Sequence, residues 1–363
     1  MNKLLTLKAA LVAASLTLAA PASADEPAAA PPVAAPPVVW KDGKTTVELD
    51  GAQLSLSNRI QIRFTSTDAE TEQRIGSFRL RRARTSLDGW LYKKELQFEL
   101  MVDWVDTPLL EDLALNWDVS RRRAFQVKVG QFKVPFGRQE LTSDTAQQFV
   151  DRSIVAAEFE KGRDQGLQLW GLLGKNRIEY RAGVFNGNGR GRSVNDNPSF
   201  QYDARVMYQP WGDARYSEGD LESGRRPLLA VAANFETNDA RPAATKRTLV
   251  GGDVAVKYRG VSLMAEGFRR QLTPAAAASH ASNGYHAQLG FFVKPRVLEA
   301  ALRYASFDPS GRVLGDGRRE RGIALSYLWK KHLLKVQTDF RQLLDRAKDD
   351  STFELRGQLQ FVF

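Results

Sequence analysis

The sequence predicts an all-β fold, a transmembrane antiparallel β-barrel with about 16 strands and an aqueous lumen. Three observations predict it. Apolar and polar residues alternate in segment after segment from about residue 45 to Phe363. The chain begins with an export signal. No later apolar run has the roughly 20 residues that a helix needs to cross a bilayer, so a helical membrane protein is excluded.

Residues 1–24 predict a secretory signal peptide. Lys3 and Lys8 give a basic start, residues 11–20 form a short apolar run, and residues 22–24 supply the small side chains that a signal peptidase reads. The apolar run is too short for a membrane anchor. We therefore expect export, with the mature chain beginning at Asp25.

The next residues, 25–44, predict a periplasmic tether. Ala and Pro dominate them as far as Val39, and this composition favours an extended, PPII-like chain over a packed core. The expected organisation is therefore a signal peptide at 1–24, a tether at 25–44 and an outer-membrane barrel at 45–363.

The first strand of the predicted barrel shows the alternation. Its apolar face carries Leu54, Leu56, Ile60, Ile62 and Phe64, and its polar face carries Ser55, Ser57, Arg59, Gln61 and Arg63. A period of two places successive side chains on opposite faces of a strand. The polar faces carry ionised groups of both signs, strand after strand. This favours lipid outside and water inside over a soluble sandwich.

Aromatic residues near the strand ends support the same interpretation. On the apolar faces they are Trp104, Trp117, Tyr208, Tyr258, Tyr304 and Trp329. Such residues are typical of the girdles at the two membrane interfaces. Because a bilayer forbids open sheet edges, we expect the last strand, which ends at Phe363, to pair with the first and close the barrel.

Sixteen segments can be counted from the alternation. They centre near residues 59, 82, 100, 115, 128, 169, 181, 205, 232, 254, 264, 289, 301, 325, 337 and 358. The alternation slips phase around residues 78–89, which predicts a β-bulge. An even number near sixteen leaves a water-filled lumen, and fourteen or eighteen strands are the alternatives.

The links between these segments differ in length. Residues 259–260 and 330–332 are tight links that suit the periplasmic side, and the longer polar links at 186–198, 238–248, 271–283 and 306–320 suit the outer face. Residues 210–227 form an exception, because this link is long although its position in the alternation makes it periplasmic.

Composition limits the chemistry. The chain has no Cys, three His residues (His280, His286 and His332) and a net charge of +10. No Ser/His/Asp set and no paired His spacing is present, so we expect no enzyme, no catalytic residue, no metal site and no cofactor. His286 is in phase with Gln288 and is expected to face the lumen. The basic balance suits nucleic acid, an anionic membrane or an anionic solute, and export argues against nucleic acid.

Three strings carry a family resemblance. GQFKVPFGRQELTS at 130–143 resembles the signature of the phosphate-selective porin O/P family, and QFVDRS at 148–153 and FRLRRAR at 78–84 are similar to other segments of that family. The resemblance implies a homotrimeric, sixteen-stranded porin in the outer membrane of a Gram-negative bacterium, with its third loop folded into the lumen as a constriction. It implies passive diffusion of small anions, with phosphate or polyphosphate as the named substrates. Its other partners would be outer-membrane lipid and lipopolysaccharide, and the outer-membrane assembly machinery, whose recognition signal the C-terminal Phe363 resembles.

Carried over by position, the resemblance also implies site residues. The constriction loop would run from Phe136 to about residue 163, with the candidates Arg138, Arg152, Lys161 and Arg163. The anion pathway along the strands would use Arg59, Arg63, Arg79, Arg81, Arg84, Lys128 and Arg356, where Arg84 needs the bulge to reach the lumen. A guanidinium ladder lowers the barrier for anions and binds phosphate through two nitrogens. The alternative is that these arginines pair with lumenal Glu99, Asp103 and Asp118 and only stabilise the wall.

The loop departs from the pattern of a tight phosphate trap. Residues 137–164 hold six acidic and four basic side chains. General anion-preferring diffusion is therefore the main expectation, with phosphate selectivity as its finer form. The competing functions are a non-conducting structural or adhesive barrel with a plugged lumen, and a barrel enzyme.

Overall fold

The computed structural model describes residues 37–70, 73–160, 162–192, 194–214, 216–241 and 245–363. The predicted signal peptide and residues 25–36 of the predicted tether lie outside these ranges. Among the described residues, no helix is long and apolar enough to cross a bilayer.

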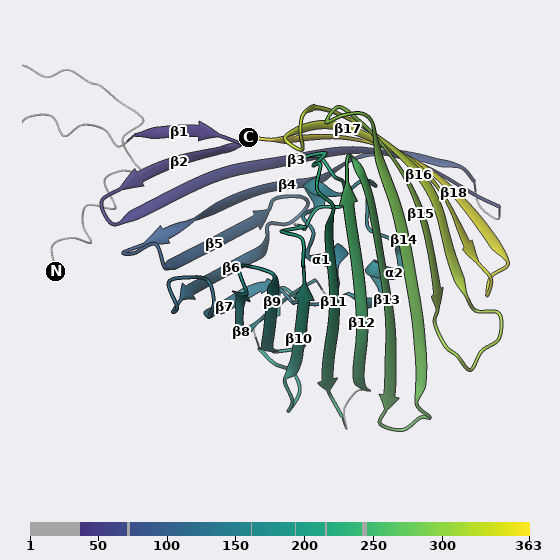
Figure 1. Cartoon of the computed structure of the whole chain (residues 1–363). Coiled ribbons are helices and arrows are strands. Elements are labelled where there is room, and N and C mark those ends of the chain that lie inside the picture. The colour runs from purple at the N-terminus through teal and green to yellow at the C-terminus, as the bar shows by residue number, and fades with distance from the viewer. Residues whose placement is uncertain (1–36, 71–72, 161, 193, 215, 242–244) are drawn as a thin grey trace, which may run out of the picture. The chain divides into compact units, whose positions relative to one another are not determined.

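Sixteen of the described strands form one closed antiparallel barrel (Figure 1). They are β3 (Ala52–Ala69), β4 (Ile75–Leu91), β5 (Leu96–Asp103), β6 (Leu109–Asp118), β7 (Gln126–Lys133), β8 (Arg163–Leu173), β9 (Ile178–Phe185), β10 (Gln201–Tyr208), β11 (Leu228–Asp239), β12 (Thr245–Tyr258), β13 (Val261–Pro274), β14 (His280–Lys294), β15 (Leu298–Asp308), β16 (Arg318–Lys330), β17 (Leu334–Asp345) and β18 (Asp350–Val362). Strand β18 pairs with β3, from Val362 opposite Arg59 to Thr352 opposite Ala69. The predicted strand number, the closure and every predicted strand centre are confirmed.

The two faces of the strands differ as the alternation predicts. In β10, Arg205 and Met207 are buried inside the barrel, whereas Val206 and Tyr208 are exposed on its outer surface. The exposed aromatics include Trp104, Trp117, Tyr208, Tyr258 and Trp329. Tyr304 is only half-exposed, because its ring packs against Tyr285 with the ring centroids 6.1 Å apart.

The predicted bulge is present in β4 and has a consequence for the lumen. Arg81 is the extra residue between the pairs Gln61–Arg82 and Ile62–Leu80. Residues before and after a bulge reverse phase, so positions 79, 82 and 84 all share the lumenal face with their β3 partners. All four arginines of the string FRLRRAR are thereby brought to the lumen.

A short hairpin precedes the barrel. Strands β1 (Val38–Lys41) and β2 (Lys44–Leu49) pair with each other, and β2 pairs with β3. Asp42 and Gly43 form the turn, with φ values of 52° and 75°. The assignment of residues 38–44 to the tether was therefore wrong, because β-branched and aromatic residues beside an Asp-Gly turn favour a hairpin.

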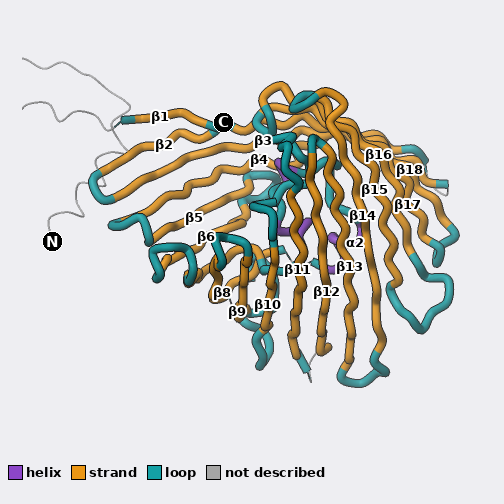
Figure 2. The backbone as a smooth tube through the Cα atoms, viewed as in Figure 1, coloured by secondary structure: helices purple, strands orange, loops and turns teal. Residues whose placement is uncertain are grey.

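The two ends of the barrel differ. One end, here called the short-turn end, carries Phe363 and the links 259–260 and 331–333. The opposite end, here called the long-loop end, carries the links that alternate with these along the chain. Several long loops are shorter than expected, because β12, β13 and β15 extend into them and leave links at 240–244, 275–279 and 309–317. Helices α1 (Arg138–Leu141), η2 (Asp144–Ala146) and α2 (Ile154–Phe159) all belong to the link between β7 and β8, and the strands enclose them (Figure 2).

Candidate functional site

The link at 134–162, here called the constriction loop, crosses the inside of the barrel. Its backbone N–H groups donate to carboxylates on the far wall. Gln139 bonds Glu266 in β13 at 2.5 Å, Val150 bonds Asp339 in β17 at 2.9 Å, and Ile154 bonds Glu320 in β16 at 2.8 Å. These bonds satisfy backbone donors that have left the sheet. The expectation of an inward-folded loop is confirmed.

Apolar packing fixes the same loop. Phe159 at the end of α2 stacks on Phe268 of β13 and meets the edge of Phe307 of β15, with both pairs of ring centroids 5.5 Å apart. Gly284 leaves room for this ring, since a Cβ there would lie 2.6 Å from Phe159. A buried aromatic cluster inside an otherwise polar lumen holds the loop against β13–β15.

A second segment enters from the opposite end. The link at 209–227, here called the inserted turn, belongs to the short-turn end, as the alternation predicts. Its buried Glu218 accepts hydrogen bonds from Gln139 Nε2 at 2.7 Å, from the backbone N–H of Gln148 at 2.7 Å and from Gln288 Nε2 at 2.8 Å. The constriction loop is therefore held by hydrogen bonds to the inserted turn as well as by hydrogen bonds to the barrel wall. Sequence reasoning found the unusual length of this link but not its inward course.

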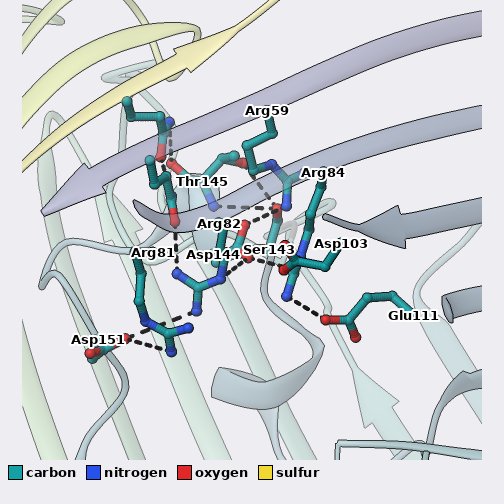
Figure 3. A network of polar contacts seen from close by, with 12 residues as sticks. Arg59, Arg81, Arg82, Arg84, Asp103, Glu111, Ser143, Asp144, Thr145 and Asp151 are labelled. Carbon is teal, nitrogen blue, oxygen red and sulfur yellow. Dashed lines mark hydrogen bonds and ion pairs between the residues drawn. The ribbon is translucent and has the colours of Figure 1, made fainter. Parts of the chain in front are cut away.

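Four arginines of β3 and β4 meet the constriction loop on the other side of the lumen (Figure 3). This arginine cluster consists of Arg59, Arg81, Arg82 and Arg84. The carboxylate of Asp144 lies 2.5 Å from Arg59 Nη1, 2.8 Å from Arg82 Nε and 2.8 Å from Arg84 Nη1.

Asp151 is the second loop carboxylate at this wall. It bonds Arg63 and lies 3.6 Å from Arg81 Nη2 and 3.9 Å from Arg82 Nη2. The two loop carboxylates therefore contact more guanidinium groups than their two negative charges can neutralise.

The arginines control the charge of both loop aspartates. Burial alone would raise the pKa of Asp144, but Arg59, Arg82 and Arg84 outweigh burial and hold that pKa well below its usual range. Burial likewise opposes ionisation of Asp151, and Arg63 outweighs it and lowers the pKa. Both carboxylates are ionised at neutral pH, so they anchor the loop as charges. The acidic balance of the loop is explained in part by these two anchors.

An open space runs beside the cluster. A cavity of about 860 Å³ is lined by eleven basic and six acidic side chains, an excess of five positive charges. A second cavity of about 580 Å³ shares Arg59, Lys128 and Trp170 with the first and continues along β3–β8. The loop thus spans the lumen from β13–β17 to the arginine cluster, and a cavity with a net positive lining remains beside it.

Six of the expected site residues line the larger cavity. They are Arg59, Arg81, Arg84, Lys128, Arg152 and Arg163. Arg163 is the first residue of β8 and donates to Asp112 at 2.7 and 2.9 Å. Arg152 lies 3.1 Å from Glu140 within the loop. Lys128 pairs with Glu99 at 2.5 Å, and Arg84 pairs with Asp103 at 2.8 Å. Ion pairs with these two carboxylates are what the alternative expected, in which the basic side chains stabilise the wall.

The other expected residues lie elsewhere. Arg63 and Arg356 are buried, and Arg356 is held by Asp339 through two bonds of 2.7 Å. Arg138 is buried beneath the Tyr216 ring, and Arg79 is exposed but lines none of the cavities described here. Lys161 lies outside the described residues.

Several cavity-lining cations were missed by the sequence reasoning. Arg82, Arg181, Arg190 and Arg341 line the larger cavity. The bulge at Arg81 was the available signal for Arg82. Arg190 reaches Glu111 at 2.6 Å from the loop between β9 and β10, a long-range contact that alternation does not encode.

Known structures share this architecture. An anion-selective porin from Comamonas acidovorans is 12% identical, with a TM-score of 0.65 over 86% of this chain and all of that chain. The outer-membrane channel DcaP of Acinetobacter baumannii is 12% identical, with a TM-score of 0.61 over 86% of this chain and 99% of that one. OmpT of Vibrio cholerae is 8% identical, with a TM-score of 0.58 over 87% and 100%.

Sequence comparisons give the family. A curated relative from Aquifex aeolicus (strain VF5), an uncharacterized protein, is 20% identical over an alignment of 279 positions that covers 66% of this chain and 64% of the relative. The match thus spans less than two thirds of that relative. The sequence model of the family described as phosphate-selective porin O and P matches residues 54–363, which is nearly the whole barrel. The barrel is therefore an outer-membrane channel, and the chain belongs to the phosphate-selective porin O and P family.

Proposed function

We propose that this channel lets small solutes diffuse passively across the outer membrane and prefers anions. The observation that carries the proposal is the excess of five positive charges around the larger cavity. Fixed cations on a pore wall lower the electrostatic barrier for anions and raise it for cations. These charges act on a permeating ion within the Debye length, which is about 10 Å at 0.1 M salt.

Phosphate is a permeant that the arginine cluster suits. All four arginines of the cluster line the larger cavity. Guanidinium groups match the geometry of phosphate oxygens. The loop carboxylates at 144 and 151 share the same arginines and weaken any one phosphate site. Phosphate therefore passes through a favourable region and is not trapped in it.

Conduction is favoured over a plugged barrel by the space that remains beside the loop. Two adjoining cavities remain beside the loop and share lining residues along the β3–β8 wall. Two of the similar structures named above are described as a porin and a channel, and neither description supports a barrel enzyme.

The cellular setting follows the same reasoning. We place the channel in the outer membrane of a Gram-negative bacterium as a homotrimer, after export by the signal peptide at 1–24. One of the similar OmpT structures is described as a trimer form. In this arrangement the short-turn end faces the periplasm and the exposed apolar residues contact lipid and lipopolysaccharide. Phe363 is then the residue that the assembly machinery recognises.

The test is the reversal potential of the channel in a planar bilayer under a KCl gradient. The variant that tests the arginine cluster is Arg59→Gln with Arg81→Gln, since both side chains line the cavity. Arg63, by contrast, is buried and does not line the cavity, so it is left unchanged. We expect the wild-type protein to favour chloride, and the ratio of chloride to potassium permeability to fall about tenfold in the variant.

The matched control is Arg259→Gln, which removes an exposed arginine at the short-turn end. It should leave the permeability ratio unchanged. A wild-type channel without anion preference would overturn the proposal. An unchanged ratio in the double variant would assign the two arginines to the stability of the wall instead.

A further inference from the structure

Arg181 on β9 lies between two aromatic rings. Its guanidinium carbon is 5.5 Å from the ring centroid of Trp170, its direct partner on β8, and 5.6 Å from that of Tyr216 in the inserted turn. Two ring faces beside one guanidinium hold it by cation–π attraction and restrict its rotation. The inserted turn therefore completes a clamp that the barrel strands alone do not provide.

A shared carboxylate fixes the orientation of the clamp. Glu179 accepts a hydrogen bond from Arg181 Nε at 2.8 Å and another from the Tyr216 hydroxyl at 2.5 Å. The Trp170 indole N–H is also engaged, because it donates to Asn116 at 2.8 Å. The guanidinium and both rings thus have fixed positions.

The outer edge of the guanidinium is available. Within the part of the chain that the structure describes, no acceptor bonds Arg181 Nη1 or Nη2. Arg181, Trp170 and Tyr216 all line the larger cavity. A planar fork with two free nitrogens is the geometry that receives the two oxygens of a carboxylate.

The same cavity has an apolar lining that an inorganic ion would not use. Apolar side chains of the wall and of the constriction loop contribute to it, namely Met101, Phe132, Leu141 and Ile154. The volume of about 860 Å³ falls in the range of small-molecule sites, roughly 300–1,000 Å³. Charge alone attracts chloride and phosphate, whereas charge combined with apolar surface favours an organic anion.

We propose that Arg181, clamped between Trp170 and Tyr216, is a binding station for organic monocarboxylates with an apolar or aromatic body. The carboxylate binds the Nη1–Nη2 edge, and the body of the acid lies against the apolar lining of the cavity. This inference rests on the proposed anion channel and names a solute class for it. The arginine cluster of β3 and β4 supplies general anion attraction, whereas Arg181 supplies preference among anions.

The test measures how benzoate, acetate and inorganic phosphate each reduce chloride current through the full-length protein in planar bilayers. We expect benzoate to block at a concentration at least about tenfold lower than acetate, because only benzoate adds an apolar body of ring size. In Arg181→Lys the charge remains but the planar fork is lost. Benzoate block should then weaken about tenfold.

The matched control is Arg123→Lys. Arg123 also lies over the Trp170 ring, at 6.0 Å, but it is exposed on a short turn and does not line the cavity. Its substitution should change neither block nor selectivity. Arg181→Gln provides a second variant if Arg181→Lys gives no channels, and measurable chloride conductance shows that a variant has folded.

Two results would overturn the station. One is equal block by benzoate and acetate in the wild-type channel, and the other is full benzoate block in both Arg181 variants. If the wild-type channel still prefers anions in either case, only the proposed role of Arg181 is refuted. A wild-type channel without anion preference would instead remove the proposed function on which the station depends.

Discussion

Replacing Asp144 by Asn removes the charge that joins the constriction loop to the arginine cluster. The carboxylate is nearly buried, with 5% of its side chain exposed, and it lies within 2.8 Å of Arg59, Arg82 and Arg84. The variant keeps the size of the side chain and a hydrogen-bond acceptor. It removes one negative charge that now offsets three arginines.

The expected change in selectivity can be worked from Coulomb's law. A charge about 6 Å from a permeating ion contributes about 0.7 kcal/mol in water, and screening at 0.1 M salt reduces this to about 0.4 kcal/mol. Chloride gains this energy when Asp144 becomes neutral, and potassium loses the same amount. The difference of about 0.8 kcal/mol raises the chloride-to-potassium permeability ratio about fourfold.

The same substitution should weaken the loop. Removing one partner of a buried ion pair costs about 3–5 kcal/mol. The hydrogen bonds that Asn retains place the expected loss near the lower limit. Asp144→Asn should therefore unfold at a lower temperature than the wild-type protein, while its channels become more selective for anions.

The assay is the reversal potential of single channels under a KCl gradient, combined with thermal unfolding in detergent. Asp239→Asn is the control, because Asp239 bonds exposed Arg241 at the end of β11 and lines no cavity described here. An unchanged permeability ratio in Asp144→Asn, together with lowered stability, would refute the claim that this charge acts on permeating ions.

Two further outcomes test the inward-folded segments. Burial raises the pKa of Glu160 well above its usual range, and Glu266 and Glu140 raise it further. Protonated Glu160 makes its full contribution to the free energy of unfolding below the ordinary glutamate pKa of about 4.3. That contribution is lost as pH rises through the raised pKa of the folded state. Glu160→Gln should therefore have a higher melting temperature than the wild-type protein at neutral pH and the same melting temperature at pH 4. Equal melting temperatures of the two proteins at both pH values would contradict this assignment. Glu218→Ala leaves three buried donors without their acceptor, at about 1–3 kcal/mol each. It should lower the melting temperature and increase current noise, whereas Glu222→Ala, an exposed glutamate of the same turn, should change neither.

The barrel was predictable because each strand is determined by residues that are neighbours in the sequence. Alternation with a period of two reports directly which side chains meet lipid, and it located all sixteen strands. The phase slip likewise indicated the bulge at Arg81. Local β-propensity and the Asp42-Gly43 turn also indicated the first hairpin, which the Ala/Pro content of the preceding residues obscured.

The site was less predictable because it depends on contacts distant in sequence. Arg59 and Arg63 share one strand face, yet Arg59 lines the cavity and Arg63 is buried beneath Asp151. Which of them stays accessible is decided by where the constriction loop lands, some 85–88 residues further along the chain. The clamp around Arg181 needs Tyr216 from the inserted turn, and alternation places no side chain of such a link.

The positive excess along the lumen should make the channel prefer anions. The most direct measurement is the zero-current potential of the wild-type channel in a planar bilayer that separates two KCl concentrations. We expect a potential whose sign shows chloride as the more permeant ion. A potential of zero, a potential with the opposite sign or a protein that never conducts would contradict it.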